Sequence, residues 1–322
     1  MAGGQTEYHL AVVQRSIDEL PPGEVLIRVN YSSLNYKDAL SAHGNKGVSR
    51  NFPHTPGIDA AGVVIACDTA EFKAGDQVIV TGYDLGMNTS GGFGQYIRVP
   101  ADWVLACPST LSLRDAMITG TAGLTAALCV EKLLCNGLHK DAGPVLVTGA
   151  SGGVGSYAVA LLAKLGFRVT ACTGKPEQET ALKKLGASDV IARDSLTERS
   201  PKPLSREQWA GAVDVAGGEV LVNILKTLQY GGSVACCGLV ASAQLPGTVF
   251  PFILRGVNLL GVDSVNLPLS VKADMWQKLA SDWRLDSLQQ LGREIGFEAL
   301  IENLQLLYRG QGTGRIVLDL GR

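Results

Sequence analysis

The chain carries, at residues 147–155, the segment Val147-Thr148-Gly149-Ala150-Ser151-Gly152-Gly153-Val154-Gly155. The apolar run 145–148 leads into it, and the glycine-free run 156–165 follows it and ends at Gly166. Strand, glycine loop and helix in this order are typical of a dinucleotide-binding site, because glycines let backbone N–H groups approach a pyrophosphate at a helix N-terminus. The alternative is a tight turn without a ligand, since alanine replaces the first glycine of the usual Gly-x-Gly-x-x-Gly pattern.

The region after the glycine loop alternates between β-type and helical patterns. The expected strands are 167–173, 189–192, 212–215 and 233–237, and an amphipathic helical run covers 177–185. Strands that alternate with helices indicate a mostly parallel sheet with helices on both faces. We therefore predict an α/β fold with a Rossmann-type, doubly wound parallel sheet.

The N-terminal third has a different pattern, with short strands at 25–31, 76–80 and 96–99 bounded by glycine or proline. This pattern favours a small antiparallel barrel or curled sheet. A helical run at 297–308 and a strand at 315–320 close the chain. We expect the tail to rejoin the barrel, which gives a barrel domain in two parts, 1–113 and 251–322, around a dinucleotide domain at 114–250.

The composition excludes several classes of function. The 322 residues include 28 Lys plus Arg against 30 Asp plus Glu, so no large field attracts nucleic acid or an anionic membrane. The seven cysteines form no Cys-x-x-Cys pair, which favours reduced thiols and a cytoplasmic location. We see no secretory signal at the N-terminus, and we assign the uncharged segment 142–163 to a soluble core because its glycines would break a membrane helix.

The end of the second expected strand predicts which nicotinamide dinucleotide is bound. NAD sites usually place an acidic residue about 20 residues after the glycine loop, where it binds the ribose hydroxyl. This chain has Thr173-Gly174-Lys175 there instead. A lysine ammonium would attract the 2′-phosphate of NADPH, so we predict NADPH. The alternative is a lysine that only lies in solvent at a turn.

Other catalytic patterns are missing from the sequence. Its four histidines are widely separated and none has a His-x-x-x-His spacing, so we predict no metal site. No tyrosine has a lysine four residues later, and the glycine loop lacks the Gly-x-Ser-x-Gly spacing of a serine hydrolase. Hydride transfer without zinc is the chemistry that these absences leave.

The chain resembles, nearly from end to end, the zinc-independent medium-chain dehydrogenases/reductases, in the quinone-oxidoreductase-like branch that includes acryloyl-CoA reductase. The segments that carry the resemblance are 32–39, 56–59, 147–155, 251–255 and 261–264. It implies a GroES-like barrel domain, an inserted Rossmann domain, NADPH in the cleft between them and a homodimer. Ile58 stands where zinc-using relatives have a histidine ligand, and Ser33 lies in the segment that would supply their cysteine.

The resemblance also implies roles for individual residues. The residues near the pyrophosphate would be Ser151, Gly152, Gly153 and Val154. The residues near the 2′-phosphate would be Thr173, Gly174, Lys175 and Arg193. The residues near the nicotinamide would be Tyr36, Leu239, Ile253 and Ser264. The loop 83–90 and the segment 309–314 differ from the family pattern, which leaves the substrate contacts and the last cofactor contact open.

A zinc-free site suits the reduction of a C=C bond conjugated to a carbonyl, because hydrogen-bond donors can stabilise the developing oxyanion. We therefore predict a reductase of an α,β-unsaturated carbonyl compound such as an enone, and the resemblance implies an enoyl thioester of the acryloyl-CoA type. Tyr36 is the candidate donor or nicotinamide neighbour, although the Asn35 to Asp38 spacing also fits a helix start at which Tyr36 only packs. A quinone reductase and a non-catalytic dinucleotide-binding or sensing protein remain as alternatives.

Overall fold

The computed structural model describes residues 8–197 and 202–321. The chain forms two compact units, and each is made of separate pieces of the sequence. The first unit contains residues up to Thr121, then Pro268–Ala273 and Gly292 onward; the second contains Ala122–Leu267 and Asp274–Leu291. The sequence placed the domain boundaries at 113/114 and 250/251. The first boundary differs because helix α2 (Leu113–Cys135) contributes residues to both units. The second differs because strand β11 (Asn258–Gly261), which follows residue 250, still pairs with the parallel sheet.

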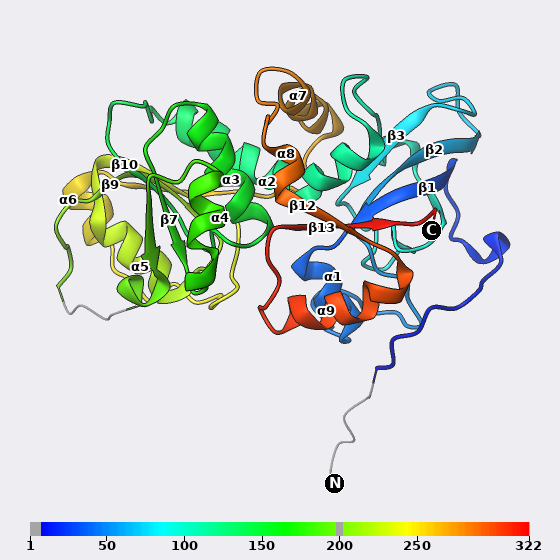
Figure 1. Cartoon of the computed structure of the whole chain (residues 1–322), viewed down its shortest axis with the longest axis horizontal. Coiled ribbons are helices and arrows are strands. Elements are labelled where there is room, and N and C mark those ends of the chain that lie inside the picture. Colours follow the sequence, from blue (N-terminus) through cyan, green and yellow to red (C-terminus); the bar gives the residue numbers. More distant parts are fainter. Residues whose placement is uncertain (1–7, 198–201, 322) are drawn as a thin grey trace, which may run out of the picture. The chain divides into compact units, whose positions relative to one another are not determined.

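The first unit is a curled, mostly antiparallel sheet (Figure 1). Strand β1 pairs with β2 along most of its length, and with β4 near its start and β13 near its end. The change of partner along β1 curls the sheet, and the apolar side chains it encloses include Ile27, Val80 and Leu318. Its elements are η1 (Ile17–Glu19), β1 (Val25–Ser33), α1 (Tyr36–Ala42), β2 (Asp59–Cys67), β3 (Gln77–Thr81), β4 (Tyr96–Val99), η2 (Ala101–Trp103), β5 (Val104–Ala106), β12 (Gly292–Ile295), η5 (Phe297–Ala299), α9 (Leu300–Tyr308) and β13 (Arg315–Asp319).

The second unit is a parallel sheet in the order β11-β10-β9-β6-β7-β8 (Figure 1). The chain starts in the middle at β6, moves outward to β8, and returns to build β9, β10 and β11 on the other side. This is the doubly wound order, and it confirms the predicted fold class. Its elements are β6 (Val145–Val147), α3 (Gly153–Lys164), β7 (Val169–Thr173), η3 (Pro176–Gln178), α4 (Glu179–Lys184), β8 (Asp189–Ala192), η4 (Arg193–Leu196), β9 (Trp209–Asp214), α5 (Gly218–Thr227), β10 (Leu228–Cys236), α6 (Phe250–Arg255), β11 (Asn258–Gly261) and α8 (Leu288–Leu291).

Two helices cross the unit boundaries along the chain: α2 (Leu113–Cys135) and α7 (Leu269–Ala280). Within the described part of the chain, α2 is the helix long and apolar enough to cross a membrane, but 72% of its apolar window is buried inside the protein. The uncharged segment 142–163 forms β6, the glycine loop and most of α3, as the sequence predicted.

Candidate active site

The glycine loop joins the end of β6 to the start of α3, at the point where the strand order reverses between β6 and β9. Gly149 has a left-handed φ of 54°, and a Cβ at Gly155 would lie 2.3 Å from the Gly149 carbonyl oxygen. These two glycines therefore allow the sharp turn and the close return of the helix. Ser151, Gly152, Gly153 and Val154 lie at the N-terminal end of α3, where backbone N–H groups bind anions.

The residues expected near a 2′-phosphate meet at the carboxyl ends of β7 and β8. Thr173 closes β7, its Oγ1 lies 2.9 Å from Ser151 Oγ, and the Lys175 N–H donates to it at 3.1 Å. A Cβ at Gly174 would lie 3.2 Å from Arg193 Cζ, so the guanidinium rests against bare backbone. The structure thus brings Lys175 and Arg193 to one place next to the glycine loop.

Two cations, Lys175 and Arg193, stand at this strand end, and each has a carboxylate near it. Partial burial lowers the pKa of Lys175, and the carboxylate of Glu177 opposes that effect. Arg193 is 62% exposed and lies 3.9 Å from the carboxylate of Asp194, which is 89% exposed, so the two form a weak surface pair. Two cations at one strand end can each form a charge-assisted hydrogen bond with a phosphate dianion.

Beneath the loop lies a buried carboxylate that the sequence analysis did not identify. Asp214 Oδ1 accepts from Thr148 Oγ1 at 2.7 Å, and its Oδ2 accepts from the Gly217 N–H at 2.8 Å. Burial raises the pKa of Asp214, while the hydrogen bonds from Thr148, Gly217 and Ala216 act in the opposite direction. The pair Thr148 and Asp214 ties the ends of β6 and β9 together. The available signal was an aspartate at a strand end followed by two glycines.

Three residues of the second unit that are expected near the nicotinamide differ in burial: Ser264 is buried, whereas Leu239 and Ile253 are exposed. Ser264 is buried and accepts a hydrogen bond of 2.7 Å from Thr125 Oγ1 of α2, a partner that the sequence analysis missed. Leu239 follows β10 beside the Gly217 turn and is 61% exposed. Ile253 lies on α6 and is 69% exposed. Exposed apolar side chains of this kind suit contact with another molecule.

In the first unit, Tyr36 is the first residue of α1 and is half-buried. The Asn35 N–H donates to Asp38 Oδ2 at 2.7 Å, so the helix start that the Asn35 to Asp38 spacing indicated is present. Asp38 Oδ1 accepts from the N–H groups of Ile58 at 2.9 Å and Gly57 at 3.2 Å. The turn that presents Tyr36 is therefore bonded to the segment that leads into β2.

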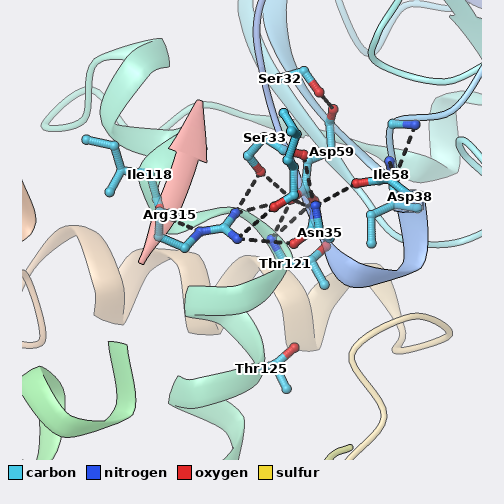
Figure 2. A network of polar contacts seen from close by, with 12 residues as sticks. Ser32, Ser33, Asn35, Asp38, Ile58, Asp59, Ile118, Thr121, Thr125 and Arg315 are labelled. Carbon is cyan, nitrogen blue, oxygen red and sulfur yellow. Dashed lines mark hydrogen bonds and ion pairs between the residues drawn. The ribbon is translucent and has the colours of Figure 1, made fainter. Parts of the chain in front are cut away.

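A second buried carboxylate in this unit, Asp59, is bonded to Asn35 of this turn (Figure 2). Its Oδ2 accepts from Ser33 Oγ at 2.6 Å and Asn35 Nδ2 at 2.8 Å, and its Oδ1 accepts from Thr121 Oγ1 at 2.6 Å. The guanidinium of Arg315, on β13, lies 3.8 Å away and is only 2% exposed. We call Ser33, Asn35, Asp59, Thr121 and Arg315 the Asp59 cluster.

The two carboxyl groups, Asp38 and Asp59, differ in their surroundings. Asp38 is bonded to backbone N–H groups, whereas Asp59 also faces a guanidinium and two hydroxyl groups. Burial, and after it the charge of Asp59, raise the pKa of Asp38 to about 7, although the hydrogen bonds from Asn35 and Ile58 lower it. Asp38 therefore titrates near neutral pH.

The segment where zinc-using relatives bind their metal is filled by other contacts. Ile58 is 2% exposed, and Ser33 Oγ is engaged with Asp59 and Arg315. His54 Nε2 is 2.8 Å from the Gly86 carbonyl oxygen, and His43 stacks on Tyr308 with 3.9 Å between ring centroids. Over residues 8–197 and 202–321, no group of three or more His, Cys, Asp or Glu side chains is arranged to hold a metal ion.

The loop 83–90, which departs from the family pattern, begins with a strained residue. Tyr83 has a left-handed φ of 52°, and its ring stacks on Trp103. The buried Lys272 Nζ lies 3.4 Å from the centroid of the Tyr83 ring and donates to the Thr81 carbonyl at 2.6 Å. A buried cation thus fixes the start of this loop, and the sequence analysis did not detect it.

Comparison with known proteins places these features in a family. Residues 21–109 match the model of the alcohol dehydrogenase GroES-like domain, and residues 153–283 match that of the zinc-binding dehydrogenases. The acrylyl-CoA reductase AcuI of Ruegeria pomeroyi is 46% identical over 310 residues, which cover 96% of this chain and 94% of the relative. The putative quinone oxidoreductase YhfP of Bacillus subtilis is 46% identical over 306 residues, or 95% of this chain and 93% of the relative.

Solved structures agree with the sequence comparison. The Escherichia coli K-12 protein YhdH with bound NADPH has a TM-score of 0.93 and 45% identity, and the match covers 96% of this chain and 95% of that one. The Bacillus subtilis protein yhfP with bound NAD has a TM-score of 0.92 and 46% identity, over 95% and 93% of the two chains. Similar folds therefore hold either nicotinamide dinucleotide, and the residues at the end of β7 become the informative ones.

Proposed function

The chain belongs to the zinc-independent branch of the medium-chain dehydrogenases/reductases, together with quinone oxidoreductases and acrylyl-CoA reductases, and from this we propose an NADPH-dependent reductase of activated C=C bonds. Its substrate would be an α,β-unsaturated carbonyl compound or thioester of the acrylyl-CoA type. The choice of NADPH rests on the pair of cations, Lys175 and Arg193, beside the glycine loop and at a strand end that lacks the acidic residue of an NAD site. The choice of substrate class rests on the 46% identity to the acrylyl-CoA reductase AcuI.

The residues at the glycine loop fit NADPH. Gly155 admits only a hydrogen atom next to the Gly149 carbonyl, which keeps the N-terminus of α3 close to the loop for a pyrophosphate. Thr173, Gly174, Lys175 and Arg193 would hold the 2′-phosphate. When bound, NADPH supplies a hydride. Leu239, Ile253 and Ser264 would line the nicotinamide side, and the Thr125 hydroxyl fixes the orientation of Ser264.

Reduction of a conjugated C=C bond needs a hydrogen-bond donor for the carbonyl oxygen on which negative charge develops. We propose Tyr36 for that contact, because it opens α1 and its backbone is held from both sides by Asn35 and Asp38. A phenol can donate a hydrogen bond without a metal ion. Tyr36→Phe should therefore lower kcat with little change in fold, and an unchanged kcat would contradict this role.

A quinone reductase is the second candidate, and the identity to the putative quinone oxidoreductase YhfP favours it. A non-catalytic dinucleotide-binding protein is the third. One set of measurements distinguishes the three candidate functions. Loss of NADPH absorbance is followed with acrylyl-CoA, simple enones and quinones in parallel. The proposal requires the highest kcat/KM with an enoyl thioester or enone. A preference for quinones would favour the second candidate, and NADPH binding without oxidation by any acceptor would favour the third.

We also propose that the protein is a cytoplasmic homodimer. Its free cysteines suit a reducing compartment. Strand β11 lies at the edge of the parallel sheet, and the exposed apolar side chains of the same unit include Val240, Val249 and Leu254. Uncovered strand edges and apolar patches favour pairing with a second copy. Light scattering coupled to gel filtration would test this, and the mass of a single chain at micromolar concentration would contradict it.

A further inference from the structure

The Asp59 cluster directs several hydrogen bonds at one buried carboxylate. Besides the contacts described above, the Thr121 N–H donates to Asp59 Oδ2 at 3.0 Å. Arg315 donates to the Ile118 carbonyl at 2.9 Å, to Ser33 Oγ at 2.8 Å and to Asn35 Oδ1 at 3.3 Å. Buried ion pairs contribute little net stability compared with apolar residues of the same size, so stability alone does not account for this cluster.

The cluster connects Asn35 with Thr121. Asn35 precedes Tyr36, and Thr121 precedes Thr125, the partner of Ser264. Asn35 is bonded through its side chain to both Asp59 and Arg315 (Figure 2), and in the sequence it immediately precedes Tyr36. Thr121 follows Gly120, where α2 is kinked, and Thr125, the partner of Ser264, lies one helical turn further on.

The kink is itself shaped by the cluster. Gly120 has φ 48°, and a Cβ there would lie 2.6 Å from Asp59 Oδ2, 2.6 Å from Ser33 Oγ and 2.7 Å from an Arg315 nitrogen. A glycine at this position therefore leaves the room in which the carboxylate and guanidinium approach the helix. The left-handed conformation also turns the Thr121 N–H and hydroxyl toward Asp59.

We propose that Asp59, with Arg315 as its counter-ion, is a positioning residue for the reductase reaction, and that it acts by fixing the backbone on which Tyr36 stands. This inference rests on the role proposed for Tyr36. Asp59 itself touches neither substrate nor cofactor, since its carboxylate is fully buried among its own donors. Its effect on kcat must pass through Asn35 to Tyr36. The effect should therefore depend on the Tyr36 hydroxyl, which would not be so if Asp59 only stabilised the fold.

The test is a double-mutant cycle between Asp59→Asn and Tyr36→Phe, with kcat and both KM values measured in steady state with NADPH and the best acceptor. A displacement of about 1 Å can cost about 100-fold in rate, so we expect Asp59→Asn to lower kcat by about tenfold or more. KM for NADPH should stay within about twofold, because the glycine loop lies on the other unit. In the Tyr36→Phe background the same substitution should lower kcat by no more than about twofold.

Asp59→Asn leaves the buried Arg315 charge without its partner and can impair folding, so a milder pair of variants accompanies it. Thr121→Val removes the hydroxyl donor but keeps the N–H bond to Asp59, and Thr121→Ser retains both donors. We expect Thr121→Val to lower kcat in the Tyr36 background only, and Thr121→Ser to restore it. Asp286→Asn, at a side chain that is 97% exposed on the second unit, is the matched control and should leave kcat unchanged.

Three outcomes overturn the proposal. Equal losses of kcat in the Tyr36 and Tyr36→Phe backgrounds would show that the cluster acts independently of Tyr36. A rise in KM for NADPH without a fall in kcat would place its effect on cofactor binding. An unchanged kcat in Tyr36→Phe alone would remove the role of Tyr36, whereas the ranking of acceptors by the wild-type protein tests the reductase function separately.

Discussion

Asp38 should make the stability of the protein depend on pH in a direction opposite to that of an ordinary salt-bridged carboxylate. Burial and the neighbouring Asp59 charge raise its pKa from 3.8 to about 7 in the folded state. The folded protein therefore binds a proton between about pH 4 and pH 7 that the unfolded chain has lost, so stability falls as pH rises through that window. At about 1.36 kcal/mol for each pKa unit, the fall contributed by this group is about 4 kcal/mol.

The substitution Asp38→Asn removes this titrating group and leaves every other one in place. The amide removes the charge but turns an N–H₂ group toward one of the backbone donors from Asn35 and Ile58, which costs about 1 to 3 kcal/mol at low pH. As pH rises to about 8, the wild type loses about 4 kcal/mol that the variant keeps. The variant should thus be less stable in acid and at least as stable in weak alkali.

Urea-induced unfolding, followed by circular dichroism at closely spaced pH values, measures this difference. Asp286→Asn, on an exposed aspartate, is the control and should give a curve parallel to the wild type. The reasoning is refuted if the wild-type and Asp38→Asn stabilities remain parallel across the window. It is also refuted if the difference between them changes in the opposite direction.

Three further predictions concern the cofactor. Lys175→Glu should lower kcat/KM for NADPH by about 10- to 100-fold through loss of a charge-assisted bond and leave kcat/KM for NADH nearly unchanged; equal losses for the two cofactors would argue against a 2′-phosphate contact. Gly155→Ala should abolish NADPH binding in calorimetry, because its Cβ would lie 2.3 Å from a carbonyl oxygen, whereas Gly94→Ala, whose Cβ has 3.4 Å to its nearest neighbour, should bind normally. Prolonged dialysis against a chelator should leave kcat unchanged, since the described residues form no metal-binding group, and a loss restored by zinc would contradict that expectation.

The sequence predicted those parts of the protein in which neighbouring residues carry the information. The glycine loop, the strand before it and the helix after it were predicted because the glycine spacing and the apolar runs lie within about 20 residues of each other. Lys175 was predicted from its distance to the loop. The doubly wound order followed from the alternation of strands and helices.

Long-range pairings were not predicted, because no local pattern encodes them. The ion pair between Asp59 and Arg315 joins the second strand of the chain to the last one, and Lys272 contacts Tyr83, which is also far from it in the sequence. The kink at Gly120 was also missed, since a glycine inside an apolar helix looks like an ordinary helical residue until its φ is known. Buried charges are the features that sequence patterns represent least well.

The coupling between the two buried carboxyl groups gives a last prediction, which connects stability to the Asp59 cluster. The charge of Asp59 is the second of the two causes that raise the pKa of Asp38, and burial is the first. Asp59→Asn removes that charge, so the pKa of Asp38 should fall from about 7 while burial keeps it above 3.8. The window in which stability falls with pH should therefore become narrower and end at a lower pH. Proton uptake on unfolding, measured by calorimetry in buffers of different ionisation enthalpy, would detect the change. An unaltered window in Asp59→Asn would mean that burial alone sets the titration of Asp38, and that the two carboxyl groups act independently.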